Sequence, residues 1–126
     1  MIIKYVITCL YYNKFNPTKN SIMYKYGLSV KFKSTEDNRQ KLSSVLLKAS
    51  ELVSRAKGCQ LYLVSLDEDE PDTIWTTEIW DSREDHENSL SVIGVKELIS
   101  QATPLFTAPP EKVKEIKIIG GFGINP

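Results

Sequence analysis

The chain has 126 residues, the usual size of one domain, and its 41% hydrophobic and 25% charged residues exclude a disordered protein. Lys plus Arg balance Asp plus Glu at 16 each, so no excess positive charge indicates a nucleic acid or an anionic membrane as partner. Two cysteines, Cys9 and Cys59, are too few for a disulfide framework or a four-ligand zinc site, and we expect a reducing cytoplasm as the setting.

The first 22 residues lack the regular patterning of the rest of the chain. The apolar stretch from Ile2 to Tyr12 is too short for a membrane span and has no cleavage site, so we expect neither membrane insertion nor secretion. Patterning starts at Met23, which predicts an extension over 1–22, either non-native or a mobile arm, a domain over 23–122 and a tail over 123–126. The alternative is an extra edge strand, because alternate positions of the extension fit one: Ile3, Tyr5, Ile7 and Cys9.

The first predicted strand runs from Tyr24 to Phe32, where large apolar and aromatic residues occupy every second position. Ser34 is the expected N-cap of the helix that follows, with Asp37 in its first turn. Gly58 is the expected stop of this helix. Between them, three-and-four spacing gives one buried stripe: Leu42, Val45, Leu46, Ala49, Leu52, Val53 and Ala56.

The next two strands are predicted over 59–66 and 73–80, because both segments are rich in β-branched, aromatic and large apolar residues. The acidic stretch from Asp67 to Asp72 contains Pro71 and predicts a solvated turn, so the strands form an antiparallel hairpin.

The last third of the chain predicts a split helical region and a final strand. Ser82 caps a short helix that extends to about Ser91, and Gly94 breaks it. A second apolar stripe then precedes a last strand over 113–122, which ends in a flexible glycine-rich terminus; the stripe contains Leu98, Ile99, Ala102, Leu105 and Phe106.

The resulting order is β-α-β-β-α-β, which is the ferredoxin-like α+β arrangement of a four-stranded antiparallel sheet. Helices cover one face of such a sheet, yet Tyr, Trp, Leu and Ile side chains occur on both faces. We therefore expect a C2 homodimer, a dimeric α+β barrel, that buries the second face in an interface of roughly 2,000 Å² or more.

A Trp-centred run, from Thr77 to His86, ends the third strand and opens the acidic helix, and Pro104-Leu105-Phe106 follows later. In these segments the chain resembles the antibiotic biosynthesis monooxygenase (ABM) family of dimeric α+β barrels, over nearly all of 23–122. The resemblance implies oxidation of quinol-like or polyaromatic substrates by molecular oxygen without a cofactor, or haem degradation as in a related branch. It places Glu78 in the family's glutamate position and Trp80 at the border of a cleft between sheet and helices.

The chain departs from the family at several positions. Many relatives have histidines where this chain has Ser89 and Gly94. Enzymatic relatives often have a strand asparagine where this chain offers Thr76 or Ser29, which removes one amide donor for a developing oxyanion. These differences weaken a direct transfer of activity.

Two residues carry the functional interpretation. Trp80 either fills core volume or stacks against a flat aromatic substrate. His86 is the only histidine and so the only side chain with an ordinary pKa suited to a general base near neutral pH. It is the candidate catalytic residue if it faces the cleft, and a structural or surface residue otherwise. Trp75, on alternate positions from Trp80, is expected on the opposite face of the sheet.

Further substrate contacts are expected from Thr76, Glu78, Tyr24, Tyr26 and Tyr62. The three phenols can hydrogen-bond a quinol oxygen, or they pack as strand aromatics commonly do. A single histidine with no nearby cysteine gives no basis for a structural metal site. The resemblance implies in addition that no cofactor is bound and that molecular oxygen is the co-substrate.

The leading hypothesis is thus a cytoplasmic homodimeric monooxygenase that binds a planar aromatic small molecule between sheet and helices. The second hypothesis is a haem-binding or haem-degrading relative, for which His86 is the one available imidazole ligand. The third is a non-enzymatic dimeric module that binds a small molecule, because fold alone does not separate it from an enzyme.

Overall fold

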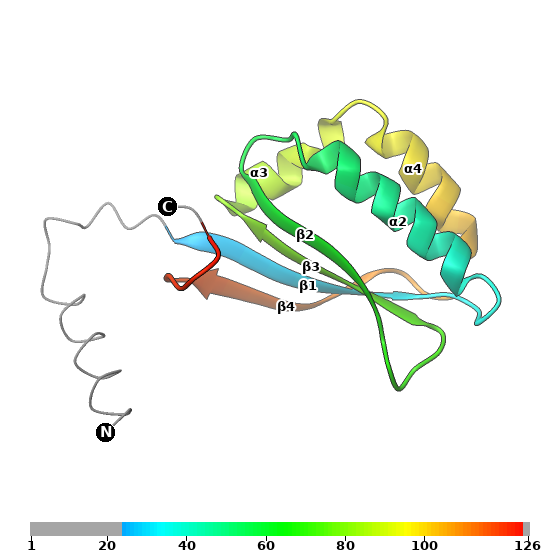
Figure 1. The fold of residues 1–126 in the computed structure, drawn as a ribbon. Coiled ribbons are helices and arrows are strands. Elements are labelled where there is room, and N and C mark those ends of the chain that lie inside the picture. The colour runs from blue at the N-terminus through cyan, green and yellow to red at the C-terminus, as the bar shows by residue number, and fades with distance from the viewer. Residues whose placement is uncertain (1–23, 125–126) are drawn as a thin grey trace, which may run out of the picture.

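The computed structural model describes residues 24–124. The extension predicted over 1–22, with its alternative as an edge strand, lies outside the described residues, and so does the end of the tail. The main elements follow the predicted order (Figure 1): β1 (Lys25–Lys33), α2 (Arg39–Val53), β2 (Cys59–Leu66), β3 (Thr73–Trp80), α3 (Arg83–Asn88), α4 (Val95–Ala102) and β4 (Glu111–Ile118). Short 3-10 turns at Ser89–Ser91 and Thr103–Leu105 follow α3 and α4.

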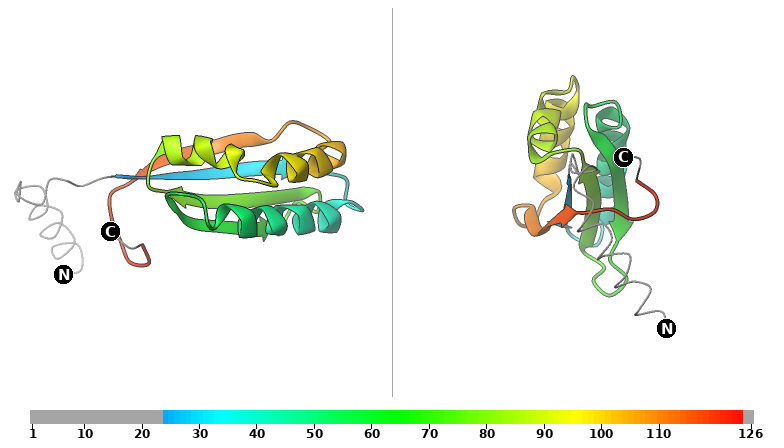
Figure 2. Two further views of the ribbon diagram at one scale, coloured as in Figure 1. Left: turned by 90° about the horizontal axis from the view of Figure 1, so that it is seen from above. Right: turned by 90° about the vertical axis from the view of Figure 1, so that its left-hand side faces the viewer.

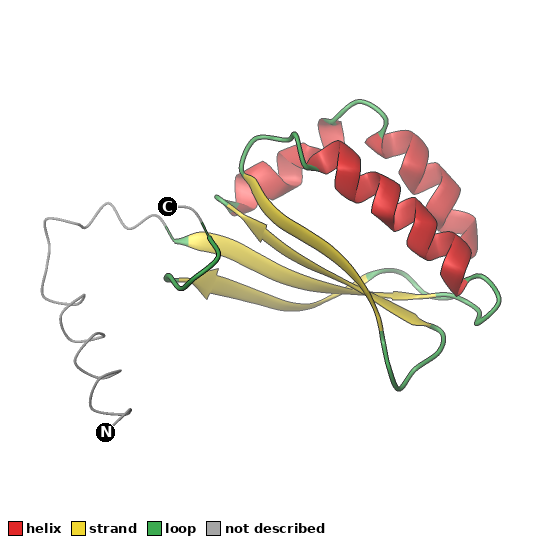
Figure 3. Cartoon of the chain, in the orientation of Figure 1, coloured by secondary structure: helices red, strands yellow, loops and turns green. Residues whose placement is uncertain are grey.

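The strands form one antiparallel sheet in the order β2-β3-β1-β4 (Figure 3). This topology confirms the predicted ferredoxin-like arrangement. The register pairs Trp80 with Tyr26 and Glu78 with Tyr62 across neighbouring strands. Because directly opposed residues point to the same side of a sheet, these four side chains share one face.

All helices cover that same face (Figure 2): α2 lies over the β2–β3 side of the sheet, and α3 and α4 lie over the β1–β4 side. Beneath them the buried apolar side chains divide into two groups. The group that we call the tryptophan cluster contains Tyr26, Leu28, Val30, Val53, Trp80 and Val95. The other, the aliphatic cluster, contains Leu42, Val45, Leu46, Ile74, Ala102 and Leu105.

The predicted cap of α2 is wrong. Ser34 is buried, its amide donates to the Asp72 carbonyl (2.9 Å), and its hydroxyl donates to the Thr35 carbonyl (2.8 Å), so it continues the end of β1. The helix begins later, at Arg39, after a turn in which Thr35 Oγ1 accepts from the Asn38 amide (3.2 Å). The cap predicted at Ser82 is confirmed, because its side chain accepts from the Asp85 amide (3.0 Å).

Strand β4 lies earlier in the chain than predicted. It starts at Glu111, directly after the two prolines, because β1 still offers Lys31 as a partner there. It ends at Ile118, which pairs with Lys25, the first residue of β1. Beyond that pair, no described residue of β1 is left to form backbone hydrogen bonds with β4.

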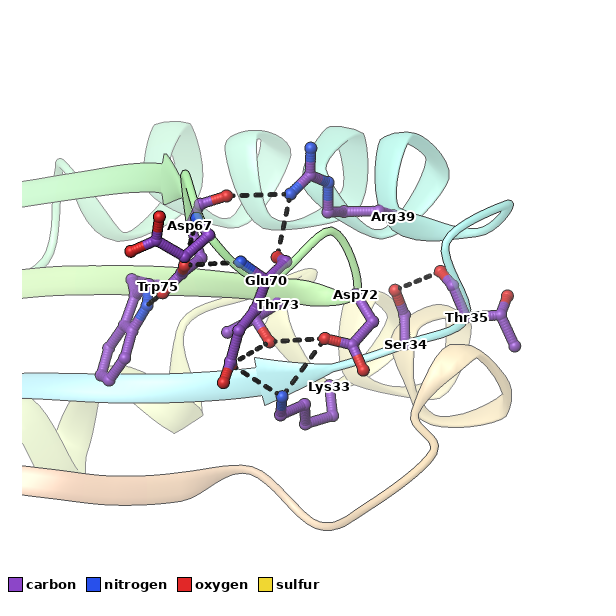
Figure 4. Close-up of polar contacts among 10 residues, drawn as sticks. Lys33, Ser34, Thr35, Arg39, Asp67, Glu70, Asp72, Thr73 and Trp75 are labelled. Atoms are coloured by element: carbon purple, nitrogen blue, oxygen red, sulfur yellow. Dashed lines mark hydrogen bonds and ion pairs between the residues drawn. The ribbon is translucent and has the colours of Figure 1, made fainter.

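The β2–β3 turn is tied to its neighbours by polar contacts (Figure 4). Lys33 Nζ at the end of β1 lies 2.9 Å from Glu70 Oε2 and 3.2 Å from Asp72 Oδ1. Arg39 Nη1 donates to the carbonyls of Asp67 and Glu70, both at 3.2 Å. The acidic turn is therefore exposed to solvent, and ion pairs and hydrogen bonds hold it against the end of β1 and the start of α2.

The opposite face of the sheet carries no helix in the described part of the chain (Figure 2). Trp75 lies on this face, as its alternation with Trp80 predicts, where its Nε1 donates to Asp67 Oδ2 (2.8 Å). Leu63 and Ile116 also belong to this face by register and are 50% and 48% exposed. Within residues 24–124, no helix is both long and apolar enough to cross a membrane.

Candidate functional site

Strand β3 carries a buried carboxylate, Glu78, on the face of the sheet that the helices cover. Glu78 is 5% exposed, and both its oxygens accept hydrogen bonds from the same strand. Trp80 Nε1 donates to Oε1 (3.1 Å), and the Thr76 hydroxyl donates to Oε2 (3.0 Å). The period-two geometry of the strand thus brings three of the predicted site residues together. Trp80 itself is fully buried, at 0% exposure.

His86 is brought to this carboxylate by α3. The Ser82 cap starts the helix directly after β3, so one turn later the imidazole lies over the end of the strand. Its Nε2 is 3.6 Å from Glu78 Oε1, and its ring meets the Trp80 ring edge-on at 5.6 Å between centroids. Its other nitrogen, Nδ1, is buried and has no hydrogen-bond partner among the described residues. His86 is therefore not a surface side chain: only 17% of it is exposed.

Tyr26 closes the other side of His86, with 5.9 Å between the two ring centroids. Its hydroxyl donates to Glu115 Oε1 on β4 (2.6 Å), and the Arg83 guanidinium lies over its ring at 5.0 Å. Arg83 in turn donates two hydrogen bonds to Glu115, at 3.2 and 3.3 Å. These contacts join β1, α3 and β4 around the histidine.

Sequence reasoning did not identify Arg83 or Glu115. They are 32 positions apart, and their contact depends on the register of β4 against β1, which places Glu115 opposite Leu28 on the helix-covered face. The only sequence signal is the position of Arg83 directly after the predicted cap.

An open cleft of about 400 Å³ borders this group at the end of the sheet. The residues that line it come from β1, the start of α3 and β4, and they include Tyr24 directly before β1, Tyr26, Ser82, Arg83 and Glu115. Tyr24 is half-exposed there, and Lys117 Nζ lies 4.9 Å from its ring centroid. The cleft offers two phenol rings, three cationic side chains and two carboxylates to a small molecule.

Burial sets the protonation of the site. It lowers the pKa of His86, with the nearby Lys112 charge as the second cause, so the imidazole is neutral at pH 7 and able to accept a proton. It raises the pKa of Glu78, against the opposing effect of the Trp80 and Thr76 hydrogen bonds. Burial, then the Glu115 hydrogen bond, raises the pKa of Tyr26 to about 12, which keeps the phenol protonated.

The remaining predicted residues lie around this group. Tyr62 lies opposite Glu78 on β2, and burial raises the pKa of its phenol. Ser89, at a family histidine position, is buried and donates to the His86 carbonyl (2.5 Å), so it closes the end of α3. Gly94 has φ +94°, which favours glycine over a histidine there.

A metal site would need several ligands at one place. In residues 24–124, no three His, Cys, Asp or Glu side chains are grouped so that they could hold a metal ion. Glu78 and His86 are therefore a pair of titratable side chains, and no third His, Cys, Asp or Glu side chain among the described residues completes a metal site with them.

Comparison with known proteins gives one family. The family model described as antibiotic biosynthesis monooxygenase matches residues 26–97, which include β1, the hairpin and α3. No match is found among curated proteins.

Solved structures show the same fold. A putative antibiotic biosynthesis monooxygenase from Chloroflexus aurantiacus is 37% identical, over 80% of this chain and 99% of that chain, with a TM-score of 0.69. A protein from Mycobacterium tuberculosis is 16% identical, over 78% and 98% of the two chains, with a TM-score of 0.67. A protein of unknown function from Bacteroides thetaiotaomicron, described as a possible oxidoreductase, is 16% identical, over 76% and 99%, with a TM-score of 0.66.

Proposed function

This chain belongs to the antibiotic biosynthesis monooxygenase family, and from that premise we propose that it is a monooxygenase that oxidises a quinol-like or other planar aromatic molecule without a bound cofactor. The observation that carries the proposal is His86. Its imidazole has a lowered pKa and a buried nitrogen without a partner among the described residues, and it lies between the rings of Trp80 and Tyr26, of which Tyr26 also lines the open cleft. Molecular oxygen is the co-substrate.

Chemistry of this kind asks little of the protein. Removing a proton from an acidic position of an aromatic substrate leaves an electron-rich anion, which can react with oxygen directly. One oxygen atom stays in the oxidised product, and the other leaves as water together with the proton that the base returns. The protein then has to accept the proton, fix the orientation of the ring and keep water away. A buried histidine with a lowered pKa meets the first requirement, because it is unprotonated at neutral pH.

The substrate enters at the cleft in this proposal. Tyr24 and Tyr26 are the first contacts, since they line it with ring faces and hydroxyls that suit a flat phenolic molecule. Trp80, Thr76, Glu78 and Tyr62 form the inner wall behind His86. Because Trp80 is fully buried, it stacks on a substrate only after Tyr26 and Arg83 move aside.

We further propose that the protein works as a homodimer. The uncovered sheet face presents exposed apolar side chains on both edge strands, Leu63 on β2 and Ile116 on β4, and a second copy packed on this face would bury them. Leu63→Glu is expected to give monomers in light scattering, whereas Leu47→Glu on the exposed side of α2 should leave the dimer intact. A wild-type monomer at micromolar concentration would refute this assembly. The free thiol of Cys59 agrees with the reducing cytoplasm proposed as the compartment.

Oxygen uptake tests the proposed activity. The full-length protein, without added metal or flavin, is mixed with a panel of naphthalene- and anthracene-type quinols in an oxygen electrode. At least one should be turned over, and His86→Gln should lower kcat by about 10²–10⁴-fold, the usual contribution of a general base. Turnover that is unchanged in His86→Gln would remove His86 from the mechanism. Binding without oxygen uptake would favour the non-enzymatic module, and a Soret shift on haem titration would favour the haem-binding relative.

A further inference from the structure

Glu78 is a buried charged side chain beside the tryptophan cluster, and the proposed proton transfer gives it no role. It is not among the residues that line the cleft, and its two oxygens accept hydrogen bonds from Thr76 and Trp80. Yet a buried carboxylate is costly to keep, and simple packing would be served better by an apolar residue. Its remaining neighbour is the imidazole of His86, 3.6 Å away.

The two nitrogens of His86 lie in different surroundings. Nε2 is the nitrogen next to the Glu78 carboxylate. Nδ1 is buried without a protein partner. In a neutral imidazole one nitrogen carries the proton and the other carries the lone pair, and the neighbouring acceptor decides which is which. A carboxylate beside Nε2 favours the proton on Nε2, which leaves the lone pair on Nδ1.

We propose that Glu78 is a positioning residue that fixes His86 as the Nε2–H tautomer and thereby makes Nδ1 the nitrogen that takes the substrate proton. Its catalytic consequence rests on the proposed function, whereas the tautomer itself is a property of the resting protein. When Nδ1 accepts a proton, the resulting imidazolium keeps its Nε2–H beside the carboxylate. The positive charge that forms is then met by a negative charge already in place.

Two features of the geometry support this assignment. The Thr76 and Trp80 hydrogen bonds hold both Glu78 oxygens on fixed donors, so the carboxylate is oriented before any substrate binds. The rings of Trp80 and Tyr26 hold the imidazole from two sides, so it has little freedom to turn Nδ1 toward Glu78 instead.

Other charged groups also act on the imidazole and must be separated from Glu78 in any test. They come from the helix itself and from β4, and among the described residues none of them forms a hydrogen bond or an ion pair with Nε2: Arg83, Glu87, Lys112 and Glu115. Glu87 is the matched control, because Glu87→Gln removes the same charge next to His86 in the chain but leaves the Glu78 contact intact.

The tautomer is measurable directly, because the chain has one histidine and therefore one imidazole signal set. Long-range ¹H–¹⁵N correlation spectra of ¹⁵N-histidine-labelled full-length protein at pH 8 should show a protonated Nε2 and a lone pair on Nδ1. Glu78→Gln should convert this pattern to a mixture of tautomers or to the Nδ1–H form, and Glu87→Gln should not. A wild-type Nδ1–H pattern, or the same Nε2–H pattern in Glu78→Gln, would overturn the proposal.

Thr76→Val serves as a second variant if Glu78→Gln does not fold. It keeps the carboxylate but removes the hydroxyl that orients Oε2, so the Nε2–H fraction should fall partway. An unchanged fraction would count against the orienting role.

Turnover separates this inference from the proposed function. With a quinol that wild type oxidises, Glu78→Gln should lower kcat by at least about 100-fold with little change in KM, as expected when a base loses its orienting carboxylate. Glu78→Asp should restore part of the loss. If the tautomer responds as predicted but no quinol is oxidised by wild type, the positioning role stands and the proposed activity fails. If quinols are oxidised equally by wild type and Glu78→Gln, the activity stands and the positioning role fails.

Discussion

The two buried clusters lie side by side under the same helices, yet they differ in chemistry. The aliphatic cluster contains apolar side chains only, and on the other face of β3 the buried Thr73 hydroxyl lies 3.0 Å from Glu70 Oε2 and 2.8 Å from Asp72 Oδ1. The tryptophan cluster adjoins a buried carboxylate, an imidazole with an unpaired nitrogen and an open cleft. Satisfied polar groups and closed packing stabilise a fold, whereas a costly buried charge with an unpaired neighbour is typical of a site. One end of the domain thus maintains the fold and the other carries the proposed chemistry.

The strongest test of this division is a cavity in the aliphatic cluster. Leu42 is fully buried, and Leu42→Ala should lower the free energy of unfolding by about 2–5 kcal/mol, measured by urea denaturation. Oxygen uptake per folded molecule should stay within about twofold, because the cluster does not contact His86. The matched control is Leu47→Ala on the exposed side of the same helix, which should cost less than about 0.5 kcal/mol. A large loss of turnover in folded Leu42→Ala would break the division.

A substitution at the other end should damage stability and activity together. Gly58 has φ +83°, and a Cβ there would lie 2.2 Å from Asp85 Oδ2 on α3. Gly58→Ala should therefore lower the free energy of unfolding by about 1–3 kcal/mol and move the helix that carries His86, with a lower kcat. Adding Asp85→Ala removes the two closest atoms but leaves the Asp85 Cβ, which would lie 2.8 Å from the added Cβ, so only part of the stability should be recovered. No recovery in this double variant would show that the clash with Asp85 is not the cause.

The buried Glu78 carboxylate should serve the proposed chemistry as an anion but lower the stability of the fold in that form. Burial raises the folded-state pKa of Glu78, so folding favours its protonated form. Its contribution to stability is present below the unfolded-state pKa of about 4.3 and is lost as the pH rises through the folded-state pKa. Glu78→Gln lacks this titration, so its melting temperature relative to wild type should rise between pH 4 and pH 8. A melting temperature that falls relative to wild type with rising pH would mean that the carboxylate stabilises the fold as an anion.

The smallest effect is expected at the ion pairs that close the hairpin end. Lys33→Ala should cost less than about 1 kcal/mol, because its partners are solvated and such pairs contribute little. The difference from wild type should shrink in 1 M salt, which screens exposed charges. Lys41→Ala on α2 is the control for a general loss of positive charge. A cost that is large and independent of salt would mean that the hairpin closure, and not only the aliphatic cluster, maintains this end.

The fold was predictable where local chemistry and periodicity agreed. The hairpin strands end where the sequence predicts, because an acidic proline-containing turn separates two apolar runs, and the Ser82 cap was identified from its own neighbours. The cap at Ser34 was not, because the contact with Asp72 that holds it in the sheet is 38 positions away in the chain. Local patterns compete with such distant pairings and do not reveal them.

The site was predictable only in part for the same reason. The family resemblance pointed to Glu78 and Trp80, Thr76 stood where relatives often have an asparagine, and His86 was a candidate because it is the only histidine. The contact between Glu115 and Tyr26 spans 89 positions, and no sequence pattern reports it. Burial of His86, which separates a base from a surface side chain, likewise follows from tertiary packing alone.

Ligand binding and chemistry are both proposed for the tryptophan end of the domain. The most direct measurement is a ¹H–¹⁵N NMR titration of the labelled protein, without oxygen, with a dihydroxynaphthalene as the aromatic quinol. We expect shift changes in the amides of Tyr24, Tyr26 and Arg83 and in the His86 imidazole, with Leu42 and Lys33 unaffected. Changes centred on the aliphatic cluster, the hairpin end or the uncovered sheet face would contradict this proposal.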